Sequence, residues 1–387
     1  MSYRPARRCA DIAPFHVMEL LARAKALETS GRDIVHMEVG EPDFPTPEPV
    51  VRAAQAAIAT GKMFYTPALG LPELRQAIAA FYRQRYGVDI AAERIVVTAG
   101  ASGALTLALA CLANPGSEWL LTDPGYPCNR HFVRAFEGIP VGIPVSAESN
   151  FQPTPAHLAA HWNPQTAGLI VASPANPTGT MLGLDQLTAL QTFVAAHQGH
   201  FIVDEIYHGL TYETDAPTAL AVSDELWVVQ SFSKYFQMTG WRLGWLVVPE
   251  AYLRDVEKLA QNLFISPSTP AQFAALAAFS PETLAILEAR RAEFRRRRDF
   301  LAPALESLGF GIAARPQGAF YLYCDCSELA PDSFALAGRL LEEAGVAATP
   351  GLDFGAHQPQ RYLRFAYTTE VERLAEAVER MRRFFGR

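Results

Sequence analysis

The sequence lacks the features of a secreted, membrane-spanning or nucleic-acid-binding protein. Its five cysteines are an odd number scattered over 387 residues, which argues against a disulfide framework and favours a reducing cytoplasm. No apolar run is long enough to cross a bilayer, and Arg4, Arg7 and Arg8 are not followed by the apolar segment of a secretory signal. The net charge of −7 gives no electrostatic footprint for nucleic acid. These absences predict a cytoplasmic protein without membrane or nucleic-acid partners.

Internal repeats and low-complexity linkers are also absent, so domain boundaries have to come from the order of predicted elements. Hydrophobic residues make up 50% of the chain and charged residues 19%, as in an ordinary soluble globular protein. The length is sufficient for a large core and for more than one domain.

Short apolar segments alternate with helical patterns through the middle of the chain, and each is apolar throughout, as expected for strands covered on both faces. These predicted strands are 95–98, 119–122, 169–172, 201–203 and 227–229. The alternation predicts an α/β fold with a mostly parallel, doubly wound sheet. Residues 243–248 continue the sheet as a parallel or an antiparallel strand.

The two ends of the chain predict a second, smaller α+β domain. Helices are predicted at 11–30, 49–60 and 71–86, with a strand at 34–39 and a proline-rich loop at 40–47. Beyond about residue 252 the chain is helical, and after Gly309 strands return at 319–323 and 362–365. The predicted domains are therefore an N-terminal segment 1–47 that joins the small domain, a large cofactor-binding domain 48–285, and a small domain 286–387.

Four consecutive arginines at 295–298 lie within the helical region. They suggest either a nucleic-acid patch or a solvated helix face. Glu288 and Glu293 stand three or four residues before arginines, which favours a solvated face.

The stretch Ser231-Phe232-Ser233-Lys234 follows a predicted buried strand, and Arg242 stands eight positions later between glycines. Lysine forms Schiff bases with carbonyls, whereas serine hydroxyls and a guanidinium suit a phosphate. The combination predicts a covalently held, anionic cofactor. An aldehyde that carries a phosphate is pyridoxal phosphate.

Four further stretches fall at the ends of predicted strands, where ligands of open α/β sheets bind. They are 98–103, 123–127, 173–180 and 204–207. The first, Thr-Ala-Gly-Ala-Ser-Gly, is either a phosphate site at a helix start or a plain tight turn. It does not match G-x-G-x-x-G, which argues against a dinucleotide.

The other three stretches each offer one group to a flat cofactor. Tyr126 is either a stacking ring or a packed loop residue, and Asn176 offers an amide to a ring oxygen or marks a turn. Asp204 ends a buried strand and needs a partner, such as a protonated ring nitrogen. A metal-binding carboxylate is the competing interpretation, but no His/Asp cluster accompanies Asp204, so no metal is predicted.

Together these segments resemble the pyridoxal-phosphate-dependent aminotransferases of class I/II, with the aspartate-aminotransferase-like fold type I. The resemblance extends from about Ile12 to the C-terminus. The matching segments, in the family's order and spacing, are GEPDF, YTPALGLPELR, TAGAS, DPGYP, NPTGT, DEIY, SFSK, GWRLGW and LRFAY.

The resemblance implies a role for each cofactor-binding residue. Lys234 would hold pyridoxal 5′-phosphate as a Schiff base and then move the proton from the substrate Cα to C4′. Asp204 would pair with the pyridine nitrogen. Tyr207 and Asn176 would hydrogen-bond the phenolic oxygen, and Tyr126 would stack on the ring. The implied phosphate-binding residues are Gly100, Ala101, Ser102, Ser231, Arg242 and Ser233, although the position of Ser233 need only be small.

The resemblance also implies a substrate site and a partner. Arg364 matches the arginine that binds the substrate α-carboxylate, with Arg361 as an alternative, and Gly40 and Asn176 would contact the same substrate. Tyr65 matches the tyrosine that reaches the phosphate of the neighbouring subunit's cofactor. A homodimer with shared active sites is therefore implied.

The substrate side chain is predicted to be neutral. Relatives specific for dicarboxylates supply a second cation, yet Ser102 stands where one subgroup has a lysine, and no Lys or Arg lies between Lys258 and Arg290. Apolar residues expected near the pocket are Phe15, Phe44 and Phe264. We therefore expect a ping-pong aminotransferase that moves an amino group from a neutral, aliphatic or aromatic, L-amino acid to a 2-oxo acid.

Three alternatives remain open from the sequence. A carbon–sulfur β-lyase would use the same cofactor contacts. An aspartate-type aminotransferase would need a hidden cation, such as an N-terminal arginine, or a network that includes Asn262 and Ser266. A non-catalytic ligand sensor is disfavoured by the intact Lys234 and Arg364.

Overall fold

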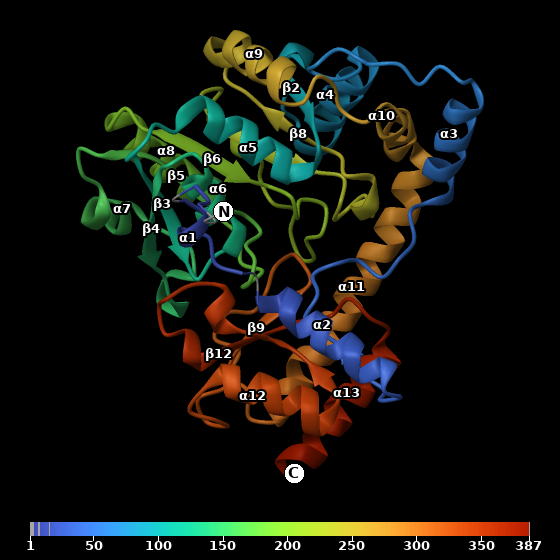
Figure 1. The fold of residues 1–387 in the computed structure, drawn as a ribbon, viewed down its shortest axis with the longest axis vertical. Helices are drawn as coiled ribbons and strands as arrows, with labels where there is room; N and C mark the ends of the chain where they lie inside the picture. The colour runs from blue at the N-terminus through green and yellow to red at the C-terminus, as the bar shows by residue number, and fades with distance from the viewer. Residues whose placement is uncertain (1–3, 7, 15, 387) are drawn as a thin grey trace.

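The computed structural model describes residues 4–6, 8–14 and 16–386. A large sheet-containing part and a smaller part lie at opposite ends of the view in Figure 1, and the long helix α11 (Pro281–Ser307) runs between them. Within the described residues, no helix is long and apolar enough to span a membrane.

The large part is built on a seven-stranded sheet in the order β2-β8-β7-β6-β5-β3-β4. β8 runs antiparallel to both β2 and β7, and the other neighbouring strands are parallel. The predicted α/β fold is therefore confirmed. The strands are β2 (Ile95–Thr98), β3 (Glu118–Asp123), β4 (Ile139–Pro144), β5 (Thr166–Ala172), β6 (His200–Asp204), β7 (Trp227–Ser231) and β8 (Gly244–Val247).

Strand β4 was not predicted from the sequence. It contains two prolines and a glycine, which are poor strand formers in a sheet interior. β4 lies at the edge of the sheet and pairs only with β3, so a missing backbone donor is tolerated there.

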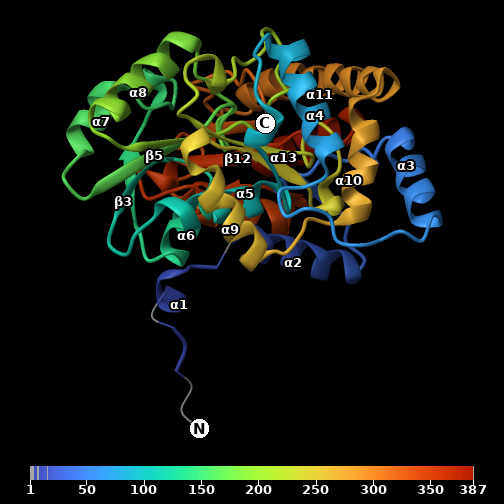
Figure 2. The same cartoon turned by 90° about the horizontal axis from the view of Figure 1, so that it is seen from above.

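Helices cover both faces of the sheet, as Figure 2 shows. Alternate residues of one strand serve the two faces: Leu120 belongs to one apolar cluster, and Trp119 and Leu121 to the other. The helices of one face are α4 (Pro72–Tyr86), α7 (Pro155–His161) and α8 (Leu184–Ala196), and those of the other are α5 (Gly100–Leu112), α6 (Pro127–Ala135) and α9 (Leu253–Leu263).

The smaller part combines both ends of the chain. β1 (Val35–His36) pairs in parallel with β10 (Val346–Ala347), which joins the N-terminal segment to the C-terminal one. A three-stranded antiparallel sheet has the order β11-β12-β9. Its strands are β9 (Tyr321–Asp325), β11 (Thr349–Pro350) and β12 (Tyr362–Ala366), and the surrounding helices are α2 (His16–Thr29), α12 (Ser333–Arg339) and α13 (Val371–Phe385).

The predicted boundaries at 47/48 and 285/286 stay predictions, and the second falls inside α11. The predicted helix 11–30 is interrupted, because α1 (Arg8–Asp11) ends before Pro14 and α2 begins at His16. The remaining helices are α3 (Glu48–Ala59) and α10 (Thr269–Leu276).

The prediction of a fully solvated face at 295–298 is wrong for two of the four arginines. The exposed fractions of Arg297 and Arg298 are 2% and 0%. Arg297 donates to both oxygens of Asp43 at 2.8 and 3.0 Å, and Arg298 is paired with Glu213. The difference arises because one side of α11 faces solvent, whereas Arg297 and Arg298 face the segments that carry Asp43 and Glu213.

Candidate active site

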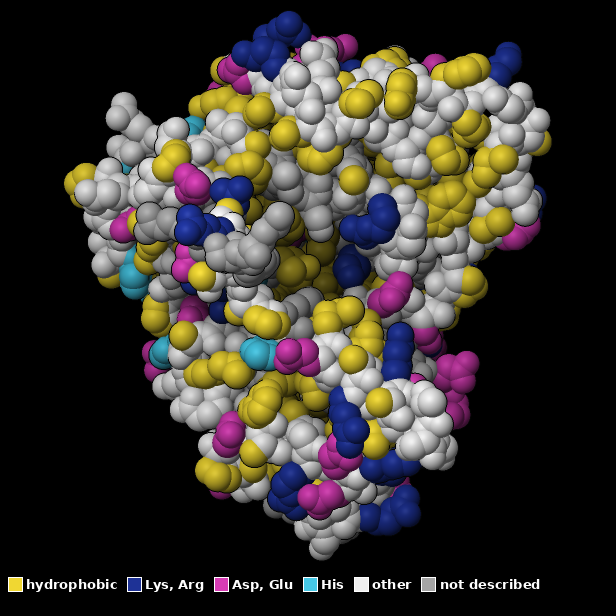
Figure 3. Space-filling model, in the orientation of Figure 1, with side chains coloured by type: hydrophobic (Ala, Val, Ile, Leu, Met, Phe, Trp, Pro, Cys, Tyr) yellow, Lys and Arg dark blue, Asp and Glu magenta, His cyan; other side chains and the backbone are white. Residues whose placement is uncertain are grey.

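A cavity of about 380 Å³ lies where the carboxyl ends of the parallel strands meet the small part. Figure 3 shows the corresponding hollow between the two parts of the molecule. Most of the residues singled out from the sequence line it together: Gly40, Ala101, Ser102, Tyr126, Asn176, Asp204, Tyr207, Ser231, Ser233, Lys234, Arg242 and Arg364.

Lys234 projects from the turn after β7, and its Nζ donates a hydrogen bond to the carbonyl oxygen of Gly40 at 2.6 Å. Burial, helped by the nearby cations Arg364 and Arg242, lowers the pKa of this amine to about 8, although the carboxylates of Glu41 and Asp204 oppose the change. An amine with that pKa is substantially neutral in mildly alkaline solution. It is therefore suited to attack a carbonyl and to accept a proton.

Asp204 is a buried carboxylate at the carboxyl end of β6. Its Oδ1 accepts the backbone N–H of Ile206 at 3.1 Å. Burial raises the pKa of Asp204 to about 7, although the Ile206 N–H and Lys234 oppose the rise. A carboxylate placed in this way favours a cationic partner in the cavity, such as a protonated ring nitrogen.

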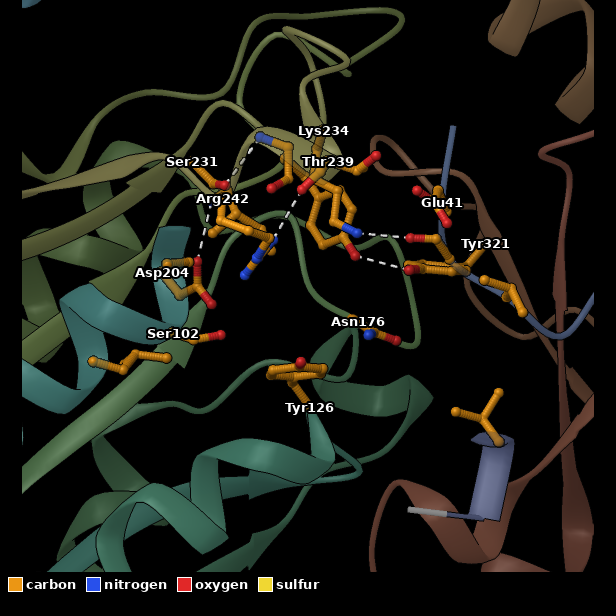
Figure 4. Close-up of a pocket in the computed structure, with 18 of the residues that line it drawn as sticks. Glu41, Ser102, Tyr126, Asn176, Asp204, Ser231, Lys234, Thr239, Arg242 and Tyr321 are labelled. Carbon is orange, nitrogen blue, oxygen red and sulfur yellow. Dashed lines mark hydrogen bonds between the residues drawn. The ribbon is translucent and has the colours of Figure 1, made fainter. Parts of the chain in front are cut away.

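Aromatic and amide groups complete the walls. Tyr126, Asn176, Asp204 and Lys234 lie around the same cavity in Figure 4. The hydroxyl of Tyr207 is 2.8 Å from that of Tyr321, which lies on β9. These side chains come from both parts of the molecule, so the cavity exists only when the two parts are packed together.

The start of α5 forms a cradle for an anion. Gly100 has a φ of +71°, and Ala99 provides no side-chain cap, so first-turn N–H groups of Ala101 and Ser102 are available to a ligand. Arg242 lies beside this turn, because a Cβ on Gly100 would stand 2.9 Å from its Nη2. Ser231 adds a hydroxyl at the end of β7. This donor set fits a phosphate group.

Arg364 is buried on β12, and its guanidinium lies over two aromatic rings. Its Cζ lies 4.3 Å from the ring centre of Tyr321 and 4.9 Å from that of Phe354. Nη1 donates to Oδ1 of Asn176 at 2.9 Å, and Nη2 donates to the carbonyl oxygen of Glu38. The guanidinium is thereby fixed at the cavity wall, in a form suited to a carboxylate.

Three predicted residues lie outside the lining of the cavity. Gly100 sits behind it, against Arg242. Arg361 is paired with Asp325 and partly exposed, so the structure does not bring it to the site. Tyr65 is 81% exposed and does not line the cavity of its own chain.

Two of the three expected apolar neighbours, Phe44 and Phe264, do not line the cavity. Phe44 instead packs edge-on against Phe294 with ring centres 5.5 Å apart, and Arg297 lies over its ring. Phe264 is exposed at the end of α9. Phe15 and Arg7 lie outside the described residues. The sequence placed these phenylalanines near motif residues, but side-chain direction was set by packing between segments.

Several lining residues were missed. Val17 and Met18 come from α2, Tyr321 from β9, and Thr239 from the segment before Arg242. The strand prediction at 319–323 contained Tyr321 but could not say what its ring would meet. No local signal connects α2 with a site most of whose residues lie in other, distant segments of the chain.

Metal ligands do not gather at this site or elsewhere in the part of the chain that the structure describes. No group of three or more His, Cys, Asp or Glu side chains there is arranged to hold an ion.

Comparisons of the chain with known proteins agree on one family. A family model described as aminotransferase class I and II matches residues 32–381. A valine–pyruvate aminotransferase of Mycobacterium tuberculosis is 40% identical over 375 residues, which cover 96% of each protein. An aspartate/prephenate aminotransferase of Thermus thermophilus is 37% identical over 385 residues, or 98% of each. A solved aminotransferase structure from Mycobacterium tuberculosis has a TM-score of 0.96 at 38% identity and covers 100% of both chains.

Proposed function

The chain belongs to the class I and II aminotransferases and is a pyridoxal-phosphate-dependent transaminase, and we propose that its amino donor is a neutral L-amino acid. The acceptor is a 2-oxo acid, and the two half-reactions follow a ping-pong order. The proposal of a neutral donor rests on the number of cations that line the cavity, which is sufficient for the cofactor and one carboxylate.

The cavity supplies the contacts that the cofactor needs. When bound, pyridoxal phosphate provides an aldehyde for attachment of an amine and a ring that withdraws electrons from the substrate Cα. Asp204 would keep the ring nitrogen protonated, and Tyr126 would stack on the ring. Ala101 and Ser102 at the start of α5, with Ser231, Ser233 and Arg242, would hold the phosphate. This assignment is supported by the buried carboxylate and by the donors gathered at the start of α5.

Lys234 carries the proton. Its amine would hold the cofactor's aldehyde carbon and, when free, would move a proton to or from the substrate Cα. The lowered pKa of Lys234 supports this role, because the amine has to be neutral to accept the proton. Tyr207 and Asn176 would hydrogen-bond the phenolic oxygen of the ring.

Arg364 binds the α-carboxylate of the donor. The described lining of the cavity contains three cations, Lys234, Arg242 and Arg364. Lys234 and Arg242 would hold the cofactor, and Arg364 would hold the α-carboxylate. No lining cation among the described residues is left for a second carboxylate, and Val17 and Met18 present apolar groups instead. The relative named valine–pyruvate aminotransferase agrees with a neutral donor.

Donor preference tests this proposal directly. Leucine, methionine, phenylalanine and alanine are compared with aspartate by kcat/KM with one common acceptor. An unpaired carboxylate in the cavity loses about 2–5 kcal/mol relative to a paired one, so the best neutral donor should exceed aspartate by at least about tenfold.

An aspartate-type activity is the second candidate, because the Thermus thermophilus relative is named an aspartate/prephenate aminotransferase. Aspartate ahead of every neutral donor by tenfold would establish it. The cation would then have to come from outside the described lining, from Arg4 or Arg8 or from a partner subunit.

A homodimer is part of the proposal. An apolar surface formed by two segments would be covered in a dimer: Ile58, Phe64, Tyr65, Leu263, Phe264 and Ile265 are all exposed. The hydroxyl of Thr269 donates to the carbonyl oxygen of Phe64 at 2.7 Å, which holds the two segments side by side. Tyr65 would project from this surface to the phosphate of the neighbouring subunit's cofactor.

A mixed dimer tests whether the active sites are shared. One subunit carries Tyr65→Ala and the other Lys234→Ala, with different affinity tags for purification. If Tyr65 acts across the interface, one site per dimer keeps both residues, and the mixed dimer regains about half of the wild-type activity. Activity no higher than that of the two parent variants, or a monomer in sedimentation, would exclude the shared site.

A cytoplasmic location completes the proposal. It is supported by the cysteines, because Cys9, Cys111, Cys128, Cys324 and Cys326 are all free thiols.

A further inference from the structure

The first turn of α2 is held over the cavity by a residue from the far end of the chain. The carboxylate of Asp353 accepts the backbone N–H of His16 at 3.0 Å through Oδ1 and that of Val17 at 2.8 Å through Oδ2. These are two of the N–H groups that a helix start leaves without a partner. The turn that they belong to carries Val17 and Met18, which line the cavity.

Asp353 is itself fixed in place. It is 3% exposed and ends the short helix η8 (Gly351–Asp353). Its backbone oxygen accepts a hydrogen bond from Arg130 of α6. The next residue, Phe354, stacks on Arg364, and its backbone oxygen accepts the N–H of Gly125 at 2.8 Å. The segment that carries the Asp353 carboxylate is therefore anchored to α6 and also contacts Arg364, the proposed carboxylate-binding arginine.

The later turns of α2 do not depend on Asp353. Ala24 and Leu27 pack into a small apolar cluster with Ile34, Leu341 and Ala347. The first turn does not belong to that cluster: Met18 is 55% exposed, and Val17, although buried, lines the cavity. Loss of Asp353 should thus loosen the first turn and leave the rest of the helix docked.

We propose that Asp353 is a positioning residue that holds Val17 and Met18 against the side chain of the amino donor and so sets the preference among neutral donors. This inference rests on the proposed function, since it assigns part of the cavity to the donor side chain. A donor with a larger apolar side chain gains from contact with Val17 and Met18. Alanine, with a single methyl group, gains little from this contact.

Asp353→Ala and Asp353→Asn test the proposal in the full-length holoenzyme. For Asp353→Ala, KM for leucine should rise about fivefold to thirtyfold, the factor that corresponds to loss of a helix cap, with a smaller change in kcat. KM for alanine should change little. Asp353→Asn keeps one acceptor and should fall between wild type and Asp353→Ala.

Ser280→Ala is the matched control. Ser280 caps α11 by accepting the N–H of Thr283 at 3.2 Å, and it does not line the cavity. Its loss should affect stability as a helix cap does but leave the leucine-to-alanine ratio unchanged. A similar ratio change in Ser280→Ala would overturn the proposal, because it would trace the effect to general destabilisation.

Two further measurements distinguish a local loosening of the first turn of α2 from a general loss of stability. Amide exchange of residues 16–18 should accelerate in Asp353→Ala, while that of residues 24–27 stays slow. In a Val17→Ala, Met18→Ala background, adding Asp353→Ala should have little further effect on KM for leucine. Unchanged exchange at 16–18, or an undiminished effect in that background, would overturn the role of Asp353.

The donor ranking of the wild-type enzyme tests the proposed function separately from the role of Asp353. If aspartate were the best donor, the neutral-donor proposal would fail. The comparison of leucine with alanine in Asp353→Ala would still report whether the first turn of α2 touches the donor side chain.

Discussion

Replacing Lys234 with alanine should abolish transamination while leaving the fold and non-covalent cofactor binding intact. The expected loss in kcat is at least about 10⁴-fold, because one substitution removes both the nucleophile and the general base. The fold should survive, since among the described residues the side chain makes a single hydrogen bond, from Nζ to the carbonyl oxygen of Gly40. The phosphate contacts at the start of α5 do not involve Lys234.

Covalent labelling identifies the lysine independently of activity. Borohydride reduction of the wild-type holoenzyme should fix the cofactor to Lys234, as read by peptide mapping. Lys258→Ala is the matched control, because Lys258 is an exposed lysine paired with Asp255 on α9. Label on Lys258, or normal turnover by Lys234→Ala, would refute the assignment of Lys234.

Asp204→Asn should slow the removal of the Cα proton by about 10²-fold to 10³-fold, as expected when a preorganised charge is lost from a reacting centre. A neutral amide cannot keep the ring nitrogen protonated, so the ring withdraws electrons less strongly. Single-turnover kinetics with a good donor measures this step directly. A near-normal rate would show that Asp204 does not control the ring.

Glu205→Gln is the matched control for Asp204→Asn. Glu205 is the neighbouring buried carboxylate, and burial raises its pKa to about 8. It accepts hydrogen bonds from Thr218 and from the backbone N–H of Ala219 and does not line the cavity. Its replacement should leave the proton-transfer step close to that of the wild type.

The same Asp204 substitution should stabilise the cofactor-free protein in alkaline solution. The pKa of Asp204 is about 7 in the folded chain against an ordinary 3.8, so the folded state holds the proton more tightly. The resulting stability is present below pH 4 and is lost as the pH rises through 7. Asparagine cannot lose that proton. The Tm of apo Asp204→Asn minus that of the apo wild type should therefore increase between pH 5 and pH 8, and a constant difference would contradict the raised pKa.

The sequence predicted the parts of this protein that are local in the chain. Asp204 ends a buried strand, and Lys234 follows another by three residues, so each motif carries its own position at the carboxyl edge of the sheet. Apolar strands between helical patterns were sufficient for the fold class. Short-range rules failed at β4, where an edge position tolerates prolines that an interior strand would exclude.

Only the tertiary structure decided which segments distant in the chain meet at the cavity. Arg297 looked like part of a solvated run, yet it is buried against Asp43 because α11 lies against that loop. Val17 and Tyr321 line the cavity, and Asp353 holds the first turn of α2 from more than 300 positions away. The residue types at the strand ends are fixed by local backbone geometry and cofactor chemistry. The cavity wall that Val17, Met18 and Tyr321 form depends on how the two parts of the molecule pack together, and no short-range pattern in the sequence encodes that packing.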